Sequence, residues 1–287
     1  MSSKWLRPEG ERAWIMGVLN CTPDSFSDGG KFVGEGAKQT VGLDRAVHHA
    51  LTMHQQGANI IDVGGESTRP GSASVPQSEE LKRVIPVIEA LAAKGLTLSI
   101  DTTKAVVMRR AIAAGASMIN DVTALRGDPE SLSVVAETGV DVCLMHMQGT
   151  PDMMQEKPEY QNVLDEVIRF FESRIEICLN AGVSEDAILI DPGIGFGKRL
   201  EDNLALIANI GILKQRFGLP VLVGTSRKSF LGQITGADVG AREVETAASV
   251  SISTFAGCDL LRVHNVEMQR KAIDVASALR DAHQGLS

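Results

Sequence analysis

The sequence predicts a (β/α)8 barrel, and three observations favour this fold. Short apolar runs rich in β-branched residues alternate with longer amphipathic stretches along the whole chain. Eight such runs are each followed by a helical pattern, which is the element count of this barrel. No linker rich in Pro, Ser or charge divides the 287 residues, so we expect one domain over 1–287 with a core at about 13–284. Counting alone leaves an open, doubly wound sheet as the alternative.

The predicted strands are short runs of Val, Ile, Leu and Met that end in polar or Gly-rich stretches. They cover 13–19, 59–63, 96–100, 117–120, 140–145, 188–190, 220–224 and 260–263. The predicted helices lie between and after them, and several end in the Gly expected just beyond a helix C-terminus, as at Gly57, Gly95 and Gly115. They cover 40–56, 78–93, 104–114, 129–138, 160–181, 204–217, 242–256 and 266–282.

The composition excludes several classes of protein. With 44% apolar and 22% charged residues, the chain is not expected to be disordered. Its formal net charge of -8 argues against nucleic acid and anionic membranes, so small molecules are the expected partners. No apolar run approaches a membrane span or a signal peptide, and we expect a cytoplasmic protein. The cysteines form no CxxC pair and are interpreted as buried, reduced thiols. They are Cys21, Cys143, Cys178 and Cys258.

The apolar run of each predicted strand ends in a polar residue. Taken alone, each is explained by the turn that ends any strand. In a barrel, however, the carboxyl ends of all strands lie on one rim, where active sites are built. Two long, polar, Gly-rich stretches at this rim, 21–39 and 66–77, have the character of lids. The strand-end residues are Asn20, Asp62, Asp101, Asn120, His146, Asp191, Thr225 and His264.

Two segments near the late strands carry cations. The sequence Ser-Arg-Lys-Ser at 226–229 follows the seventh strand, where barrel enzymes often hold phosphate; a solvated charge pair is the alternative. Arg262 and His264 alternate on the eighth strand and are expected to point the same way. Together with Lys228 they predict a cationic patch for a phosphorylated group.

The segment 191–198, Asp-Pro-Gly-Ile-Gly-Phe-Gly-Lys, matches neither the Walker A spacing nor GxGxxG. We interpret it as a glycine loop that lets backbone approach a ligand beside Asp191. Asp101 and Asp191 either form structural ion pairs or bind a cationic, guanidine-like ligand edge. Cations on one side of the rim and carboxylates on another predict a ligand that is anionic at one end and donor-rich at the other.

Other polar and sulfur-containing residues carry weaker signals. His48, His49 and His54 lie in the first helical pattern and are interpreted as surface or packing residues. His146 is ambiguous. The methionines around it are interpreted as gap-filling residues. They are Met145, Met147, Met153 and Met154.

These blocks, taken in order from about residue 14 to 265, closely resemble the dihydropteroate synthase family. The most specific are NCTPDSFSDGG at 20–30 and DVGGESTRPG at 62–71. The resemblance implies a pterin-binding (β/α)8 barrel and a transferase of folate biosynthesis. Such an enzyme joins 6-hydroxymethyl-7,8-dihydropterin diphosphate to 4-aminobenzoate and releases diphosphate. The remaining blocks are 101–104, 120–121, 191–198, 226–229 and 262–264.

The resemblance also implies the roles of individual residues. The dihydropterin ring would be held by Asp101, Asn120, Asp191 and Lys228. The diphosphate would be held by Arg262, His264 and Asn20, with Asn20 also the ligand of Mg²⁺. Thr68 would bind the pterin diphosphate or close over it. The aminobenzoate pocket would be formed by Phe26, Pro70, Phe196, Lys228 and Ser229. The residues expected to carry catalysis are Asp101, Asp191, Lys228 and Asn20.

An aromatic amine is a weak nucleophile, so we expect a dissociative, SN1-like displacement with no covalent enzyme intermediate. Sulfonamides are expected to compete with aminobenzoate because no residues are inserted after Phe26. The family is usually homodimeric through helices late in the chain. At Asn265 the chain departs from the family's common Asp.

Two other functions are the alternatives to a dihydropteroate synthase. One is a methyltetrahydrofolate-dependent corrinoid methyltransferase, which has no use for the cations at 226–229 and 262–264. The other is a non-catalytic pterin-binding protein.

Overall fold

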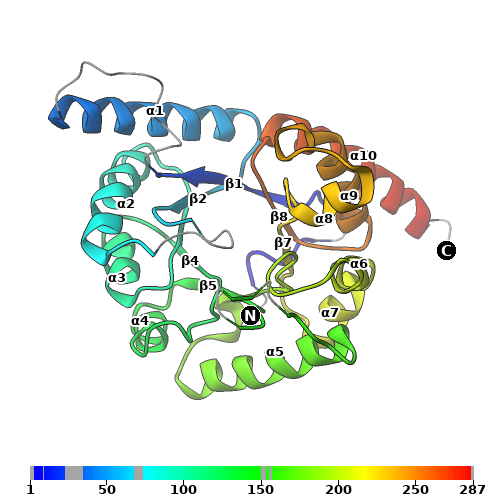
Figure 1. Ribbon diagram of the computed structural model, residues 1–287. Coiled ribbons are helices and arrows are strands. Elements are labelled where there is room, and N and C mark those ends of the chain that lie inside the picture. The colour runs from blue at the N-terminus through cyan, green and yellow to red at the C-terminus, as the bar shows by residue number, and fades with distance from the viewer. Residues whose placement is uncertain are drawn as a thin grey trace.

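Eight parallel strands form the centre of the molecule, and helices surround them (Figure 1). The computed structural model describes residues 3–8, 10–22, 35–67, 74–149, 153–154 and 157–285. The strands pair in the order β6-β5-β4-β3-β2-β1-β8-β7, and a parallel bridge between Ile190 and Val221 joins the two ends of this series. The strands therefore close into a barrel. The predicted (β/α)8 fold is confirmed, and the open sheet is excluded.

Each predicted strand is present, and most extend about one residue further than expected. The polar residue that follows several apolar runs is in fact the last paired residue of the strand. The strands are β1 (Trp14–Asn20), β2 (Ile60–Gly64), β3 (Leu98–Asp101), β4 (Met118–Asp121), β5 (Asp141–Met145), β6 (Ile188–Asp191), β7 (Leu222–Val223) and β8 (Leu260–Val263).

The parallel register sets the polar strand ends side by side. Asn20 pairs with Gly64, Gly64 with Asp101, and Asp101 with Asn120. Further round the barrel, Met145 pairs with Asp191. The strand ends therefore form one level of the rim, as predicted from the sequence.

Helices follow the strands as expected, with two differences described below. They are α1 (Glu35–Gln55), α2 (Gln77–Ala92), α3 (Ala105–Ala113), α4 (Ser131–Thr138), α5 (Val163–Asn180), α6 (Leu200–Ala208), α7 (Ile210–Phe217), α8 (Ser229–Thr235), α9 (Glu243–Phe255) and α10 (Val266–Gly285). In the described part of the chain, the 3-10 turns η2 (Glu185–Ala187) and η3 (Val239–Ala241) lie between these elements.

The predicted helix over 204–217 is wrong in detail, because two helices meet there at Asn209. The side chain of Asn209 donates to the carbonyl of Ala205 at 2.7 Å, which offers the backbone an alternative to continuing the helix. The seven-residue helix α8 has no counterpart among the predicted helices. It begins at Ser229 and ends at Thr235, and the next residue, Gly236, has a φ of +80°, the left-handed conformation of a helix C-cap.

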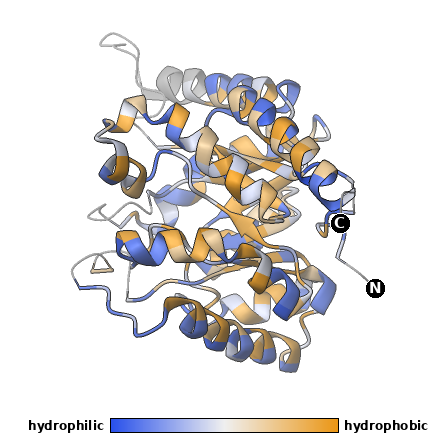
Figure 2. Ribbon diagram, turned by 90° about the vertical axis from the view of Figure 1, so that its right-hand side faces the viewer, coloured by the Kyte–Doolittle hydropathy of each residue, from blue (hydrophilic) through white to orange (hydrophobic). Residues whose placement is uncertain are grey.

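Apolar side chains fill both the barrel and the space between strands and helices. Along β2, Ile60 belongs to the cluster inside the barrel, whereas Ile61 belongs to the cluster beneath the helices. Figure 2 shows the result, hydrophobic strands in the middle and helices with hydrophilic outer turns. All four cysteines are free and buried, as predicted.

The amino-terminal mouth of the barrel is closed by residues near the start of the chain. Trp5 is buried within the interior cluster and packs edge-on against Trp14, with ring centroids 6.1 Å apart. Its indole N–H donates to Asp141 Oδ2 at 2.8 Å. Because Asp141 is the first residue of β5, this plug lies at the opposite end of the strands from Asp101 and Asp191.

Several predictions concern residues outside the described ranges. They include Phe26 and most of the first lid stretch, and Thr68, Pro70 and half of the second. The first stretch is shorter than predicted, because α1 already begins at Glu35. Within the described residues, no helix is long and apolar enough to cross a membrane.

Candidate active site

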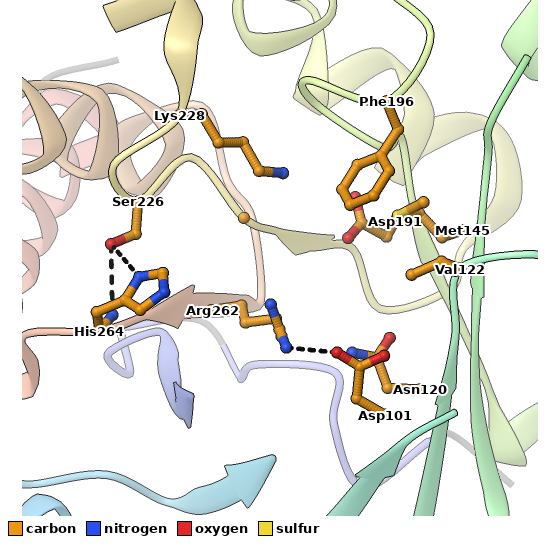
Figure 3. Close-up of a pocket in the computed structure, with 11 residues that line it drawn as sticks. Asp101, Asn120, Val122, Met145, Asp191, Phe196, Ser226, Lys228, Arg262 and His264 are labelled. Atoms are coloured by element: carbon orange, nitrogen blue, oxygen red, sulfur yellow. Dashed lines mark hydrogen bonds and ion pairs between the residues drawn. The ribbon is translucent and has the colours of Figure 1, made fainter. Parts of the chain in front are cut away.

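A pocket lies at the carboxyl ends of the strands, the face of a barrel on which active sites are built. Its walls combine carboxylates, an amide, cations, apolar side chains and one aromatic ring (Figure 3). Seven of the lining residues were predicted as site residues from the sequence. The lining residues are Asp101, Asn120, Val122, Met145, Asp191, Phe196, Gly224, Ser226, Lys228, Arg262 and His264.

Three buried groups rich in oxygen acceptors lie along one part of the wall. Asp101, Asn120 and Asp191 end or nearly end β3, β4 and β6, and each is at most 6% exposed. Burial raises the pKa of Asp191, although Lys228 and a 2.7 Å hydrogen bond from the Gly193 N–H favour its charged form. Buried acceptors of this kind need donors, so this wall is suited to a ligand edge that carries several N–H groups.

Arg262 joins two carboxylates at the side of the pocket. Its Nε donates to Asp62 Oδ2 and its Nη2 donates to Asp101 Oδ2, both at 2.7 Å. Burial disfavours the charge of Arg262, but the two carboxylates raise its pKa. Burial also raises the pKa of Asp101 to about 7, a rise that Arg262 opposes and Asp62 strengthens. One guanidinium thus offsets two buried carboxylates only in part.

The predicted separation of cations from carboxylates is therefore wrong for Arg262. This side chain reaches across from β8 to residues of β2 and β3, as Figure 3 shows for Asp101. Alternation along β8 was the basis of the prediction, and it sets only the face of the strand from which Arg262 projects. The length of this side chain allows its guanidinium to reach partners two and three strands away.

Lys228 lies above the aromatic ring of Phe196. Its Nζ is 4.7 Å from the ring centroid and donates to the carbonyl of Ile194. Burial lowers the pKa of Lys228 to about 8, and the nearby Asp191 limits this fall. A cation over an aromatic face, beside a carboxylate, can meet an anionic group and an aryl ring at the same place.

The loop between β6 and α6 contains the glycines singled out in the sequence. At Gly193, where φ is +70°, an added Cβ would lie 1.9 Å from the carbonyl oxygen of His146. At Gly197, where φ is +59°, it would lie 2.5 Å from the carbonyl oxygen of Gln148. The predicted close approach of backbone is present at these two glycines. The backbone that they approach is the segment after β5, however, and not a ligand.

Lys198 holds the loop between β6 and α6 against the segment after β5. Lys198 is 3% exposed. Its Nζ lies 3.0 Å from His146 Nδ1, 3.2 Å from the His146 carbonyl oxygen and 3.0 Å from the Phe196 carbonyl oxygen. Burial lowers the pKa of Lys198 to about 7 and that of His146 to about 2. His146, ambiguous in the sequence, is thus a neutral acceptor that helps hold the loop carrying Phe196.

The segment 226–229 does not act as one cationic unit. Arg227 points away from the pocket and pairs with Glu243 at 2.6 Å, so only Lys228 brings a cation to the lining. Ser226 lies within the lining, and its Oγ is 3.0 Å from His264 Nδ1. Ser229 is exposed as the first residue of α8 and does not line this pocket.

The remaining predicted residues lie nearby or have structural roles. Asn20 is the last residue of β1 and is half-buried at the rim. His48, His49 and His54 are exposed on α1, as predicted. Asn265 accepts from the N–H of Met268 at 3.2 Å, the bond of a helix N-cap at the start of α10.

Sequence reasoning missed several members of the site. Val122 and Gly224 line the pocket but are not among the predicted site residues, and Met145, which the sequence suggests is gap-filling, also lines it. The strand-end position of Met145, opposite Asp191, was the signal that could have identified it. Asp62 was noted as a strand-end residue, but nothing in the sequence paired it with Arg262, 200 positions later.

Comparisons with known proteins agree with this geometry. The model of the pterin-binding enzyme family matches residues 16–264. The dihydropteroate synthase of Escherichia coli K12 is 45% identical over 271 residues, which span 94% of this chain and 93% of that protein. The chain therefore belongs to the dihydropteroate synthase family of pterin-binding enzymes.

Solved structures show the same likeness. The dihydropteroate synthase of Yersinia pestis, in complex with a sulfonamide drug, is 43% identical, with a TM-score of 0.87 and 98% of each chain covered. That of Xanthomonas albilineans with 4-aminobenzoic acid is 45% identical, with a TM-score of 0.85 and 94% of each chain covered. The resemblance read from the sequence motifs is thus confirmed over nearly the whole chain.

Proposed function

We propose that this pocket carries out the dihydropteroate synthase reaction of folate biosynthesis. The enzyme joins 6-hydroxymethyl-7,8-dihydropterin diphosphate to 4-aminobenzoate, forms 7,8-dihydropteroate and releases diphosphate. The observation that carries the proposal is the lining itself, in which buried acceptors, cations and an aromatic ring surround one pocket. A substrate that is donor-rich at one end and doubly phosphorylated at the other needs such a combination.

The dihydropterin ring is held by Asp101, Asn120 and Asp191. Their oxygens accept hydrogen bonds from the N–H groups of the aminopyrimidine edge. Lys228 donates to an acceptor on the ring, since its ammonium interacts with Asp191 and lies 4.7 Å from the centroid of the Phe196 ring. The apolar side chains of Val122 and Met145 then flank the ring.

The diphosphate is held by Arg262 and His264, with Thr68 from outside the described residues. A guanidinium has five N–H donors. The two ion pairs of Arg262 use one donor on Nε and one on Nη2, so others remain for phosphate oxygens. Paired donors on a planar group are well suited to this task.

Mg²⁺ fits this site as a partner of the diphosphate. Within the described residues, no three His, Cys, Asp or Glu side chains come together as metal ligands. Mg²⁺ often binds through one or two protein oxygens together with substrate phosphates, and Asn20, half-buried at the rim, has a suitable amide oxygen. When bound there, the ion would offset charge on the departing diphosphate.

The aminobenzoate is bound by Phe196 and Lys228 of the lining and by Ser229, which follows Lys228 at the start of α8 outside the lining. Phe26 and Pro70, from outside the described residues, complete this site. The Phe196 ring packs against the aryl ring, and the Lys228 ammonium above it attracts the carboxylate. A sulfonamide has the same aryl amine with an anionic group opposite. We therefore expect sulfonamides to compete with aminobenzoate.

The reaction is a dissociative, SN1-like displacement. The C–O bond to diphosphate breaks first, the electron pair leaves with the diphosphate, and the amine of aminobenzoate then attacks the pterin methylene. Asp101 and Asp191 stabilise the cation that develops on the pterin, while Arg262, His264 and Lys228 stabilise the leaving group. The proton lost by the amine passes to solvent or to the released diphosphate.

Turnover of the purified chain tests this proposal. With the pterin diphosphate, 4-aminobenzoate and Mg²⁺, we expect dihydropteroate and diphosphate in equal amounts. With the amine omitted, slow release of diphosphate supports the dissociative order of steps. Strict dependence of that release on the amine would exclude this order, and the absence of dihydropteroate would exclude the function.

Helices α9 and α10 pack against each other, and we infer that a second copy of this chain covers the apolar face that they form. Five large apolar side chains are exposed there, each by at least 44%. Apolar residues gathered in this way mark association surfaces, and we propose a homodimer that is cytoplasmic. The residues are Val244, Ile252, Phe255, Val275 and Leu279.

Light scattering tests this assembly. The wild type is expected at twice the mass of the chain, and Val275→Glu, exposed by 62%, is expected to shift it towards the monomer. Val106→Glu on α3 is a control, because Val106 is also exposed but lies on another helix. A monomeric wild type would contradict the proposed dimer.

A further inference from the structure

Asp62 lies behind the lining, and two of the residues that bind substrate share one of its oxygens. Asp62 Oδ2 accepts from Arg262 Nε at 2.7 Å and from Asn120 Nδ2 at 3.0 Å. Asp62, Asn120 and Arg262 each follow, by two positions, a residue whose side chain belongs to the cluster inside the barrel. Because side chains alternate along a strand, all three also point into the barrel. One buried carboxylate thus contacts residues of β4 and β8.

The other oxygen of Asp62 has no such partners. Asp62 is 0% exposed, and its Oδ1 makes no hydrogen bond within the described part of the chain. A buried acceptor without a partner destabilises a fold, so stability does not explain the carboxylate at this position. Residues that break the ordinary rules of packing are concentrated at functional sites.

An ionised carboxylate only accepts hydrogen bonds, and this determines how Asn120 is oriented. Its NH2 group must face Asp62, which leaves its carbonyl oxygen for a donor on the substrate. The same oxygen of Asp62 fixes the plane of the Arg262 guanidinium through Nε. The two contacts with Asp62 therefore set the direction of the Asn120 carbonyl oxygen, an acceptor, and of the remaining N–H donors of Arg262.

We propose that Asp62 is a positioning residue for the pterin diphosphate. It orients Asn120 for the ring and Arg262 for the diphosphate, so that both ends of one substrate are recognised in a fixed relation. The inference rests on the proposed function of the pocket. It adds a residue that touches neither substrate and acts through two that do.

Asp62→Asn keeps the shape of the side chain and removes its charge. We expect the KM for the pterin diphosphate to rise by about 10- to 100-fold, the range for loss of charge-assisted hydrogen bonds. The KM for 4-aminobenzoate should change less than about twofold, because Asp62 contacts neither Phe196 nor Lys228. Should Asp62→Asn fail to fold, Asp62→Ser repeats the measurement with a smaller polar side chain.

Asp259→Asn is a matched control at the other end of the barrel. Asp259 is also 0% exposed, and it accepts from Lys214 Nζ at 2.6 Å and from the Val221 N–H at 3.0 Å. Its loss should lower Tm and leave both KM values unchanged. A lower Tm with unchanged KM in Asp62→Asn as well would reduce Asp62 to a structural residue and overturn the proposal.

Double-mutant cycles separate this proposal from the function of the pocket. Arg262→Lys and Asn120→Ser are each combined with Asp62→Asn, and affinity for the pterin diphosphate is measured by calorimetry. If Asp62 acts through these residues, each double variant loses less affinity than the product of the single losses. Independent, multiplicative losses in both cycles would refute the role of Asp62 while leaving substrate binding itself intact.

Discussion

The two mouths of this barrel are built from similar strands and have opposite chemistry. At the amino-terminal mouth, Trp5 closes the barrel over an apolar cluster. Its indole donates to Asp141, and Asp259 nearby is paired with Lys214. At the carboxyl-terminal mouth, carboxylates and cations crowd around an open pocket.

The difference is clearest in the ionisable groups. Burial raises the pKa of Asp101 to about 7 and lowers that of Lys228 to about 8, so both have been moved towards neutral pH. Asp62 even retains a buried oxygen without a partner among the described residues. One end of the barrel is organised for stability, and the other holds buried charged groups that their protein partners satisfy only in part.

Trp5→Ala should have the largest energetic effect and affect only stability. Loss of a buried Trp typically costs about 3–5 kcal/mol of the free energy of unfolding. Chemical denaturation measures this loss. Both KM values should stay near those of the wild type at a temperature where the variant is folded. A large change in KM would mean that the two mouths are not independent.

Asp101→Asn should affect activity far more than stability. We expect kcat to fall on the order of 100-fold, because the variant loses the negative charge that stabilises the developing cation. Steady-state kinetics gives the loss, and calorimetry checks that Tm is retained. A rate close to that of the wild type would return Asp101 to a structural role beside Arg262.

Lys198→Met should act on one substrate only. Without the ammonium, the loop that carries Phe196 loses its contacts with His146, and we expect the KM for aminobenzoate to rise about tenfold, the loss of roughly one hydrogen bond to a charged group. The KM for the pterin diphosphate should change less. Equal changes in the two values would show that Lys198 supports the whole pocket and not the aminobenzoate side.

The pH dependence of kcat/KM should show the titration of Asp101 and Lys228. Asp101 is neutral below its pKa of about 7, so kcat/KM for the pterin diphosphate should rise as the pH increases through that value. Lys228 loses its proton above its pKa of about 8, so kcat/KM should fall as the pH passes it. Lys228→Arg should move the alkaline limb upward. An unchanged alkaline limb in this variant would assign it to another group.

The sequence predicted most of the fold and much of the site for a physical reason. The spacing and length of the apolar runs predict the strands. When parallel strands close into a barrel, their carboxyl ends come together, as those of β3 and β4 do at Asp101 and Asn120. Long side chains could not be followed in this way. Arg262 reaches Asp62, Arg227 turns away to Glu243, and Lys198 joins His146, 52 positions earlier. Such pairings depend on geometry that periodicity does not contain.

A crystal structure of the chain with the pterin diphosphate would show whether this pocket binds the substrate as proposed. We expect the aminopyrimidine edge within hydrogen-bond distance of Asp101, Asn120 and Asp191, and the diphosphate on Arg262 and His264. Asn120 should still donate to Asp62. A pterin ring bound elsewhere, or a diphosphate that avoids Arg262 and His264, would refute the proposed mode of binding.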